Sequence, residues 1–141
     1  MPIFDNALTM TSAGRWLRVN EASHSEVISE DGYTTVMWIS QSMHEHYYNL
    51  NHNDQDIRVS NSWVYTHESQ SFVDVNETLL GKKVLCYYAN NAVWDTITDV
   101  TKVTGSFTGS TLVTNDGGGV FIGQHTIAFD CPAMLVTEKT T

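Results

Sequence analysis

Residues 42–56, SMHEHYYNLNHNDQD, concentrate side chains that can ligate a metal or move a proton. If this stretch is a strand, His44 and His46 project from the same face, because side chains alternate along a strand. Three further histidines are available as a third zinc ligand: His52, His67 and His125. The competing interpretation is a solvated strand end that runs into an Asn- and Asp-rich turn and needs no metal.

The second half of the same stretch carries hard oxygen ligands of the kind that calcium prefers. They are Asn51, Asn53, Asp54 and Asp56. Their spacing lacks the D-x-[DN]-x-[DN]-G pattern with a distal glutamate that marks a calcium-binding loop. We therefore predict no metal and no other cofactor, and keep His44, His46 and His52 as the metal candidates to be tested.

Catalysis by a nucleophilic serine is not indicated, because the chain has no Gly-x-Ser-x-Gly elbow. Acid–base catalysis near neutral pH depends most often on histidine. The candidates for that role are His44, His46 and His125.

Aromatic side chains form the second group of candidates, because they can line a ligand cavity or an interface. Tyr47 and Tyr48 stand among polar residues, as interface tyrosines often do. In the segment 57–66, alternation places Trp63 and Tyr65 on one face, which we predict to be the interior. These four residues are the predicted binding residues.

The elements that must position these side chains are strands. No window keeps helical spacing of apolar residues, whereas β-branched and aromatic residues dominate many short segments. The predicted strands span residues 15–19, 33–39, 57–66, 71–75, 83–88, 92–98, 100–107, 109–114, 119–129 and 133–137.

Tight turns separate these strands, most clearly at Asn115-Asp116-Gly117, which predicts a hairpin over 109–129. At 141 residues the chain is expected to form a single domain over 1–141. The predicted fold class is all-β, an antiparallel barrel or sandwich with tight hairpins and little or no helix. Cys86 is expected to be a buried, unpaired thiol.

The formal net charge of −9 argues against phosphate backbones and anionic lipid as partners. No apolar run approaches the length of a membrane span, and the first residues do not resemble a signal peptide. We therefore expect a soluble protein with neither nucleic acid nor membrane as a partner.

The absence of a catalytic motif favours a structural protein that self-associates or joins other structural subunits. The leading prediction is an accessory virion component of a phage-like head or tail. Two alternatives remain open. One is a small β-barrel that binds a hydrophobic ligand or a glycan through its aromatic side chains; the other is a small barrel enzyme of isomerase, cyclase or hydrolase type that uses His44, His46 or His125.

We predict that the chain, purified without a histidine tag and dialysed, carries no stoichiometric zinc or calcium. Elemental analysis by mass spectrometry measures this directly. The matched controls are the double substitutions His44→Ala with His46→Ala and Asp54→Asn with Asp56→Asn. Metal that survives dialysis in the unsubstituted chain and disappears in either double variant would contradict the prediction.

Overall fold

The computed structural model describes residues 3–4, 7–30, 32–53, 55–123 and 132–138. Its elements are β1 (Ile3–Phe4), β2 (Leu8–Met10), β3 (Trp16–Arg18), η1 (Val19–Glu21), β4 (Glu26–Ser29), β5 (Gly32–His52), β6 (Gln55–Val59), β7 (Ser62–Thr66), β8 (Ser71–Asp74), η2 (Glu77–Leu79), β9 (Lys83–Tyr88), β10 (Asn91–Thr114), β11 (Val120–Ile122) and β12 (Ala133–Glu138). Only two single-turn 3-10 segments, η1 and η2, interrupt the strands of these residues. All described strand pairs are antiparallel, so the predicted all-β antiparallel class is confirmed.

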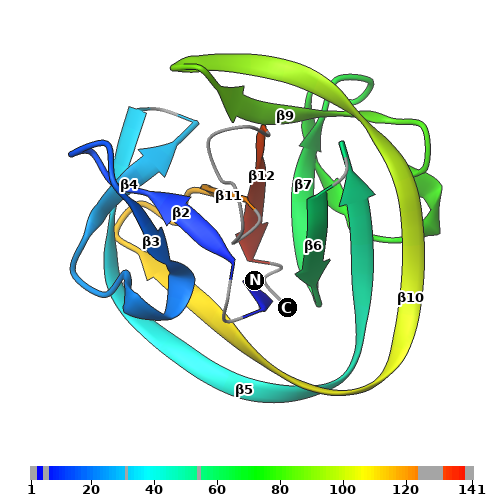
Figure 1. Ribbon diagram of the computed structural model, residues 1–141, viewed down its shortest axis with the longest axis horizontal. Helices are drawn as coiled ribbons and strands as arrows, with labels where there is room; N and C mark the ends of the chain where they lie inside the picture. Colours follow the sequence, from blue (N-terminus) through cyan, green and yellow to red (C-terminus); the bar gives the residue numbers. More distant parts are fainter. Residues whose placement is uncertain (1–2, 5–6, 31, 54, 124–131, 139–141) are drawn as a thin grey trace.

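Two long strands, β5 and β10, form a ribbon that curves around the molecule (Figure 1). Their pairing runs from His52 opposite Ile97 to Val36 opposite Thr114, with three register shifts on the way. Such bulges bend a strand and increase its twist, so one continuous pair can serve opposite sides of the same core. The segments predicted as separate strands at 92–98, 100–107 and 109–114 all belong to β10.

The remaining strands complete one curled sheet in the order β11-β12-β7-β9-β10-β1-β6-β5-β4, with β8 added to β7. Strands β2 and β3 form a separate two-stranded sheet. Within the described residues no helix is long and apolar enough to span a bilayer.

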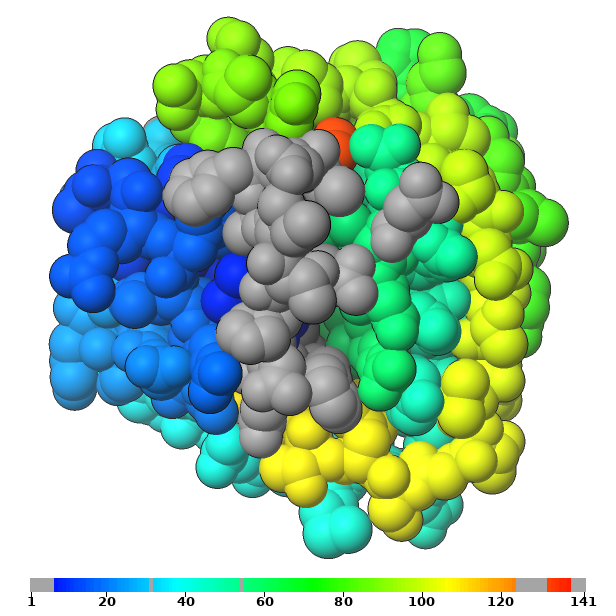
Figure 2. Space-filling model, in the orientation of Figure 1, coloured from blue at the N-terminus to red at the C-terminus, as the bar shows by residue number. Residues whose placement is uncertain are grey.

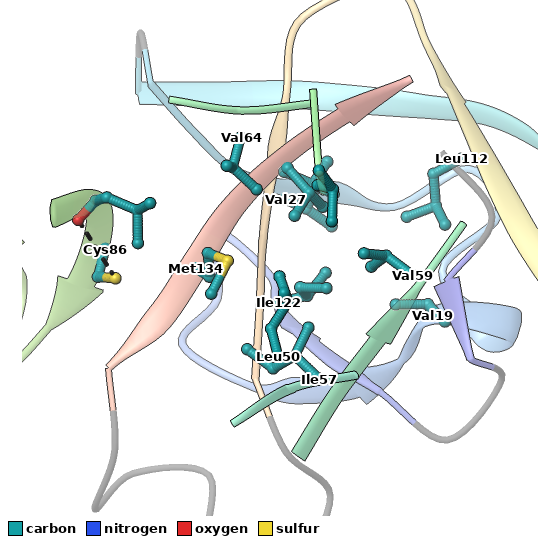
Figure 3. Packing of buried hydrophobic residues seen from close by; sticks show 14 of the residues in the cluster. Val19, Val27, Leu50, Ile57, Val59, Val64, Cys86, Leu112, Ile122 and Met134 are labelled. Carbon is teal, nitrogen blue, oxygen red and sulfur yellow. Dashed lines mark hydrogen bonds between the residues drawn. The ribbon is translucent and has the colours of Figure 1, made fainter. Parts of the chain in front are cut away.

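The inner face of the curled sheet encloses the main hydrophobic core (Figure 3). Leu50, Val59, Val64 and Met134 meet there from four different strands, and each is fully buried. Cys86 lies in the same cluster as a buried free thiol, as predicted. Because the strands that supply this core are far apart in sequence, the core depends on the curvature of the whole sheet.

Strand β12 is covered on both of its faces. Met134 and Val136 belong to the main core, whereas Ala133 and Leu135 belong to a second apolar cluster on the opposite side of the sheet. That second cluster is completed by Met10, Ile28 and Phe121. The β2–β3 hairpin and β4 therefore pack on the outer face of this part of the sheet.

The predicted strand 57–66 is in fact two strands, and its predicted faces are wrong. A link at Ser60 and Asn61 separates β6 from β7, and Asn61 adopts a left-handed φ of +48°. The link moves Val64 into the core and turns Trp63 and Tyr65 to the half-buried outer face. A single left-handed residue is enough to exchange the two faces of a strand.

The hairpin predicted over 109–129 is also wrong within the described residues. Strand β11 pairs with β12 and not with β10. Side-chain hydrogen bonds to the β4–β5 hairpin hold the turn between β10 and β11. Asp116 accepts a hydrogen bond from Thr34 Oγ1 at 2.7 Å, and Glu30 accepts one from Gly119 N at 3.1 Å. These contacts dock the turn on the β4–β5 hairpin. Residues 124–129 lie outside the described residues.

The stretch 42–56 is not the exposed strand end and loop that the sequence predicted. Residues 42–52 continue β5 within the ribbon, and Gln55 already begins β6. His44 is half-buried and His46 is exposed, but His52 is fully buried. Polar residues are frequent here because successive parts of β5 have different surroundings. Some of its side chains face solvent or a polar cavity, and others face the core.

Gly117 provides a test of the turn after β10. Its φ is +71°, and a Cβ atom there would meet nothing within 4 Å, so a substitution costs backbone strain and not a clash. We expect Gly117→Val to lower the free energy of unfolding by about 1–2 kcal/mol in urea titrations. Gly117→Asn is the matched control and should cost less, because asparagine tolerates this conformation. Equal costs for the two variants would contradict the account.

Candidate functional site

The two ends of the described chain meet at the link between β6 and β7. Near the amino end, Ile3 pairs with Val59, the last residue of β6. At the carboxyl end, Glu138 pairs with Ser62, the first residue of β7. Only Ser60 and Asn61 separate these two partners, and Figure 1 shows β6 and β7, which the link joins, next to each other in the fold.

A polar cavity of about 350 Å³ lies against the same link. It is lined by residues from three segments: His44, His46 and Tyr48 from β5, Ser60, Asn61 and Ser62 from the link and β7, and Asp74, Val75 and Asn76 at the end of β8. Two imidazoles, a carboxylate and several hydroxyls are thus grouped where the chain ends arrive. We name it the end cavity.

Strand alternation along β5 places His44 and His46 in the end cavity together, as the i, i+2 spacing predicted. His44 Nε2 lies 2.8 Å from Ser42 Oγ, and its ring is tilted against Phe107 with 5.6 Å between the ring centroids. Partial burial lowers the pKa of His44 below its ordinary value of 6.5. The neutral imidazole is therefore favoured near neutral pH.

Two hydrogen bonds hold side chains of the end cavity, one on each wall. Trp63 Nε1 donates to Asp74 Oδ1 at 2.9 Å, which orients the carboxylate of this lining residue. Tyr48 donates to Glu77 with its hydroxyl 3.4 Å from each carboxylate oxygen. Partial desolvation and the charge of Glu77 both raise the pKa of Tyr48, so its hydroxyl stays protonated.

The other predicted site residues are dispersed. Tyr47 packs edge-on against Phe107 at 5.0 Å between centroids, under the Arg58 guanidinium, and does not line the end cavity. Tyr65 stacks with Trp94 on the outer face. Trp63 contributes through its bond to Asp74. His125 lies outside the described residues.

His52 belongs to a separate, buried cluster and not to the end cavity. Its Nε2 lies 3.1 Å from Cys86 Sγ and 3.8 Å from Asp95 Oδ2, and its Nδ1 lies 3.1 Å from the carbonyl oxygen of Thr96. A carbonyl can only accept, so Nδ1 carries the proton and Nε2 accepts from the Cys86 thiol.

These residue types match a catalytic Cys-His-Asp set, but their environment does not. His52 and Cys86 are both fully buried. Burial raises the pKa of the Cys86 thiol far above its ordinary value, and the charge of Asp95 adds to this effect. The thiol therefore remains neutral, and a neutral buried thiol is a poor nucleophile. We interpret the cluster as a structural hydrogen-bond network.

Sequence reasoning missed the side of the end cavity that lies opposite β5. Ser60, Ser62, Asp74 and Asn76 were not candidates, because each is an ordinary polar residue in a strand or turn. The run Ser60-Asn61-Ser62 did carry a signal, since asparagine flanked by serines is typical of turns. If this run is interpreted as a break between two strands, the sequence predicts the link between β6 and β7.

Comparisons with known proteins place the fold. No protein-family model matches the chain, and no curated protein sequence matches it either. Solved structures do match over nearly the whole chain. The bacterial intein-like domain from Clostridium thermocellum aligns with a TM-score of 0.73 and 13% identity, over 98% of this chain and 99% of that one.

Two mini-inteins give the same result. The DnaX mini-intein from Spirulina platensis has a TM-score of 0.74 and 11% identity, covering 98% of this chain and 99% of that one. The Ssp DnaB mini-intein variant M86 has a TM-score of 0.74 and 15% identity, covering 97% and 95% respectively. At these identities the likeness establishes a shared fold.

The prediction of an accessory virion component is therefore wrong, because these solved structures of the same fold are inteins or an intein-like domain and not particle subunits. Neither the predicted virion association nor the self-association has support from these neighbours. The architecture is the fold of these inteins, with Ile3 and Glu138 paired on either side of the link that lines the end cavity.

The buried His52 predicts a pH dependence of stability. Burial lowers the pKa of His52 in the folded chain below 6.5, although Asp95 and the Thr96 carbonyl act in the opposite direction. As the pH falls through 6.5, His52 of the unfolded chain binds a proton that His52 of the folded chain does not yet bind. The free energy of unfolding should therefore decrease as the pH falls from about 7.5 to about 5.5.

Urea titrations across this pH range measure the effect. His52→Gln should flatten the dependence, because glutamine does not titrate. His24→Asn removes an exposed histidine and should leave the slope unchanged. A slope that persists in His52→Gln would show that other groups cause it.

Proposed function

We propose that this chain is an intein-type domain that acts on peptide bonds at its own two ends. The observation that carries the proposal is the pairing of Ile3 with Val59 and of Glu138 with Ser62, on either side of one short link. A domain that processes the polypeptide at both of its ends must hold those ends at one place. The shared fold with mini-inteins supports the same conclusion.

The end cavity contains groups suited to such a reaction. Breaking a peptide bond requires attack on the carbonyl carbon and delivery of a proton to the departing amide nitrogen. His46 is exposed and lines the cavity, and imidazole is the side-chain group most often used for acid–base catalysis, so we assign proton transfer to it. Asp74, fixed by Trp63, supplies a negative charge that stabilises the imidazolium formed on the way.

Cys86 is excluded from this role by its position. Its thiol lies in the main core, hydrogen-bonded to His52, and does not line the end cavity. The proposed chemistry near the link therefore depends on the imidazole of His46 and the carboxylate of Asp74.

The proposal is tested with a precursor in which one soluble reporter protein precedes residue 1 and a different one follows residue 141. The precursor is incubated near neutral pH and followed by electrophoresis and intact-mass spectrometry. We expect fragments or a ligated product whose masses place the broken bonds at the ends of the domain. His46→Ala should slow their appearance by about a hundredfold, the usual scale for loss of an acid–base group.

Cys86→Ala and His24→Asn are the controls. Both should process at the rate of the unsubstituted chain if each variant remains folded by circular dichroism. A precursor that stays intact over days, or processing that is insensitive to His46→Ala, would overturn the proposal. Loss of processing in a folded Cys86→Ala variant would instead transfer the reaction to the buried cluster.

A further inference from the structure

A groove lies between three hairpins on the side of the fold away from the main core. It consists of two adjoining cavities of about 350 and 250 Å³ that share Ile28, Tyr33 and Tyr87. We name the pair the hairpin groove. Figure 1 shows the tip of the β9–β10 hairpin reaching toward the β4–β5 hairpin, with β2 and β3 beside them. In Figure 2 the β9–β10 hairpin forms the upper edge and β2 to β4 the left edge of the molecule.

The floor of the hairpin groove is packed and therefore preformed. Ile28 and Phe121 are buried in the second apolar cluster, where Trp16, Leu85 and Tyr87 pack against them. Tyr87 and Phe121 contact each other with 5.5 Å between ring centroids. A ligand would find these walls in place, so binding would not require the ordering of a loose apolar surface.

Its rim exposes aromatic faces to solvent. Tyr33 is 54% exposed and Tyr88 is 42% exposed, and both line the groove with Trp16. The hairpin turn at Ala89 and Asn90 and the polar residues Thr11 and Ser12 complete the rim. Aromatic faces separated by turn backbone and short polar side chains suit an extended peptide, which presents side chains and amide groups alternately.

The negative charge of Glu30 in the hairpin groove favours a peptide with a positively charged side chain. Glu30 lines the smaller cavity, where its carboxylate accepts from Gly119 N at 3.1 Å and from Ser29 Oγ at 2.7 Å. These neutral donors orient the carboxylate and leave its negative charge in place. None of the ion pairs found among the described residues involves Glu30. A fixed carboxylate beside exposed tyrosine rings matches a guanidinium, which pairs with the carboxylate and stacks on the aromatic face.

We propose that the hairpin groove binds an extended peptide segment in which an arginine stands among apolar residues, with the arginine at Glu30. The apolar neighbours occupy the larger cavity against Trp16 and Tyr87. A second copy of this chain is a poor occupant, because two chains of net charge −9 repel each other. The proposal concerns a surface separate from the end cavity and does not depend on the proposed function.

The probe is a fluorescein-labelled, acetylated pentapeptide with a central arginine between two leucines on each side, followed by a soluble glycine–serine tail. The matched probe carries citrulline, which is neutral and has nearly the same shape, in place of the arginine. Fluorescence anisotropy against the full chain at low salt should give saturable binding of the arginine probe. The citrulline probe should bind at least about fivefold more weakly, because the charge-assisted bond is lost.

Variants of the chain locate the binding. Glu30→Gln and Tyr33→Ala should each weaken binding of the arginine probe at least about fivefold, with the fold checked by circular dichroism. Trp38→Ala is the matched control, because Trp38 is 56% exposed but does not line the groove, and its affinity should stay within about twofold.

The outcomes separate clearly. The absence of saturable binding, equal affinity for the citrulline probe, or affinity unchanged in folded Tyr33→Ala would each overturn the proposal. The comparison of the two probes uses the unsubstituted chain, so it remains decisive even if Glu30→Gln disturbs the turn at Gly119.

Discussion

The pairing of β5 with β10 is the constraint on which the rest of the structure depends. The two strands remain paired from His52 opposite Ile97 to Val36 opposite Thr114, and three register shifts bend the ribbon without ending it. Strand β4 pairs at one end of the ribbon, and β6 and β9 pair at the other. In both hydrophobic clusters, side chains from strands that are far apart in sequence pack against each other because the ribbon curves. If the ribbon were straight, neither cluster would have an opposite wall.

The same curvature determines where chemistry can occur. Strand β1 inserts between β6 and β10, and the last residues of β12 pair with β7, so Ile3 and Glu138 both reach the ends of the Ser60–Asn61 link. The face of β5 that carries His44 and His46 passes that link and forms one wall of the end cavity. Six residues after His46 the same strand places His52 in the core beside Cys86. One strand thus supplies two imidazoles that line the end cavity and one that is fully buried in the core.

The sequence predicted the class of fold and several local features because those depend on nearby residues. Strand composition identified β9 and β12 closely, the buried state of Cys86 followed from its apolar neighbours, and the spacing of His44 and His46 placed them on one face. It did not predict that three strand segments merge into β10, because bulges interrupt the pattern of a strand without ending it. It exchanged the faces of Trp63 and Tyr65, since one left-handed residue, Asn61, resets the alternation. The opposite wall of the end cavity comes from β7 and β8, and only long-range pairing brings those strands to β5.

The central claim is that Ile3 and Glu138, at the two ends of the described chain, are held at the link between β6 and β7. The most direct measurement is a set of nuclear Overhauser effects in solution on the isotopically labelled chain. The account predicts interstrand backbone contacts between Ile3 and Val59 and between Glu138 and Ser62 in the same sample. Spectra in which β6 and β7 show their other pairings but either chain end gives no contact with its partner would contradict it.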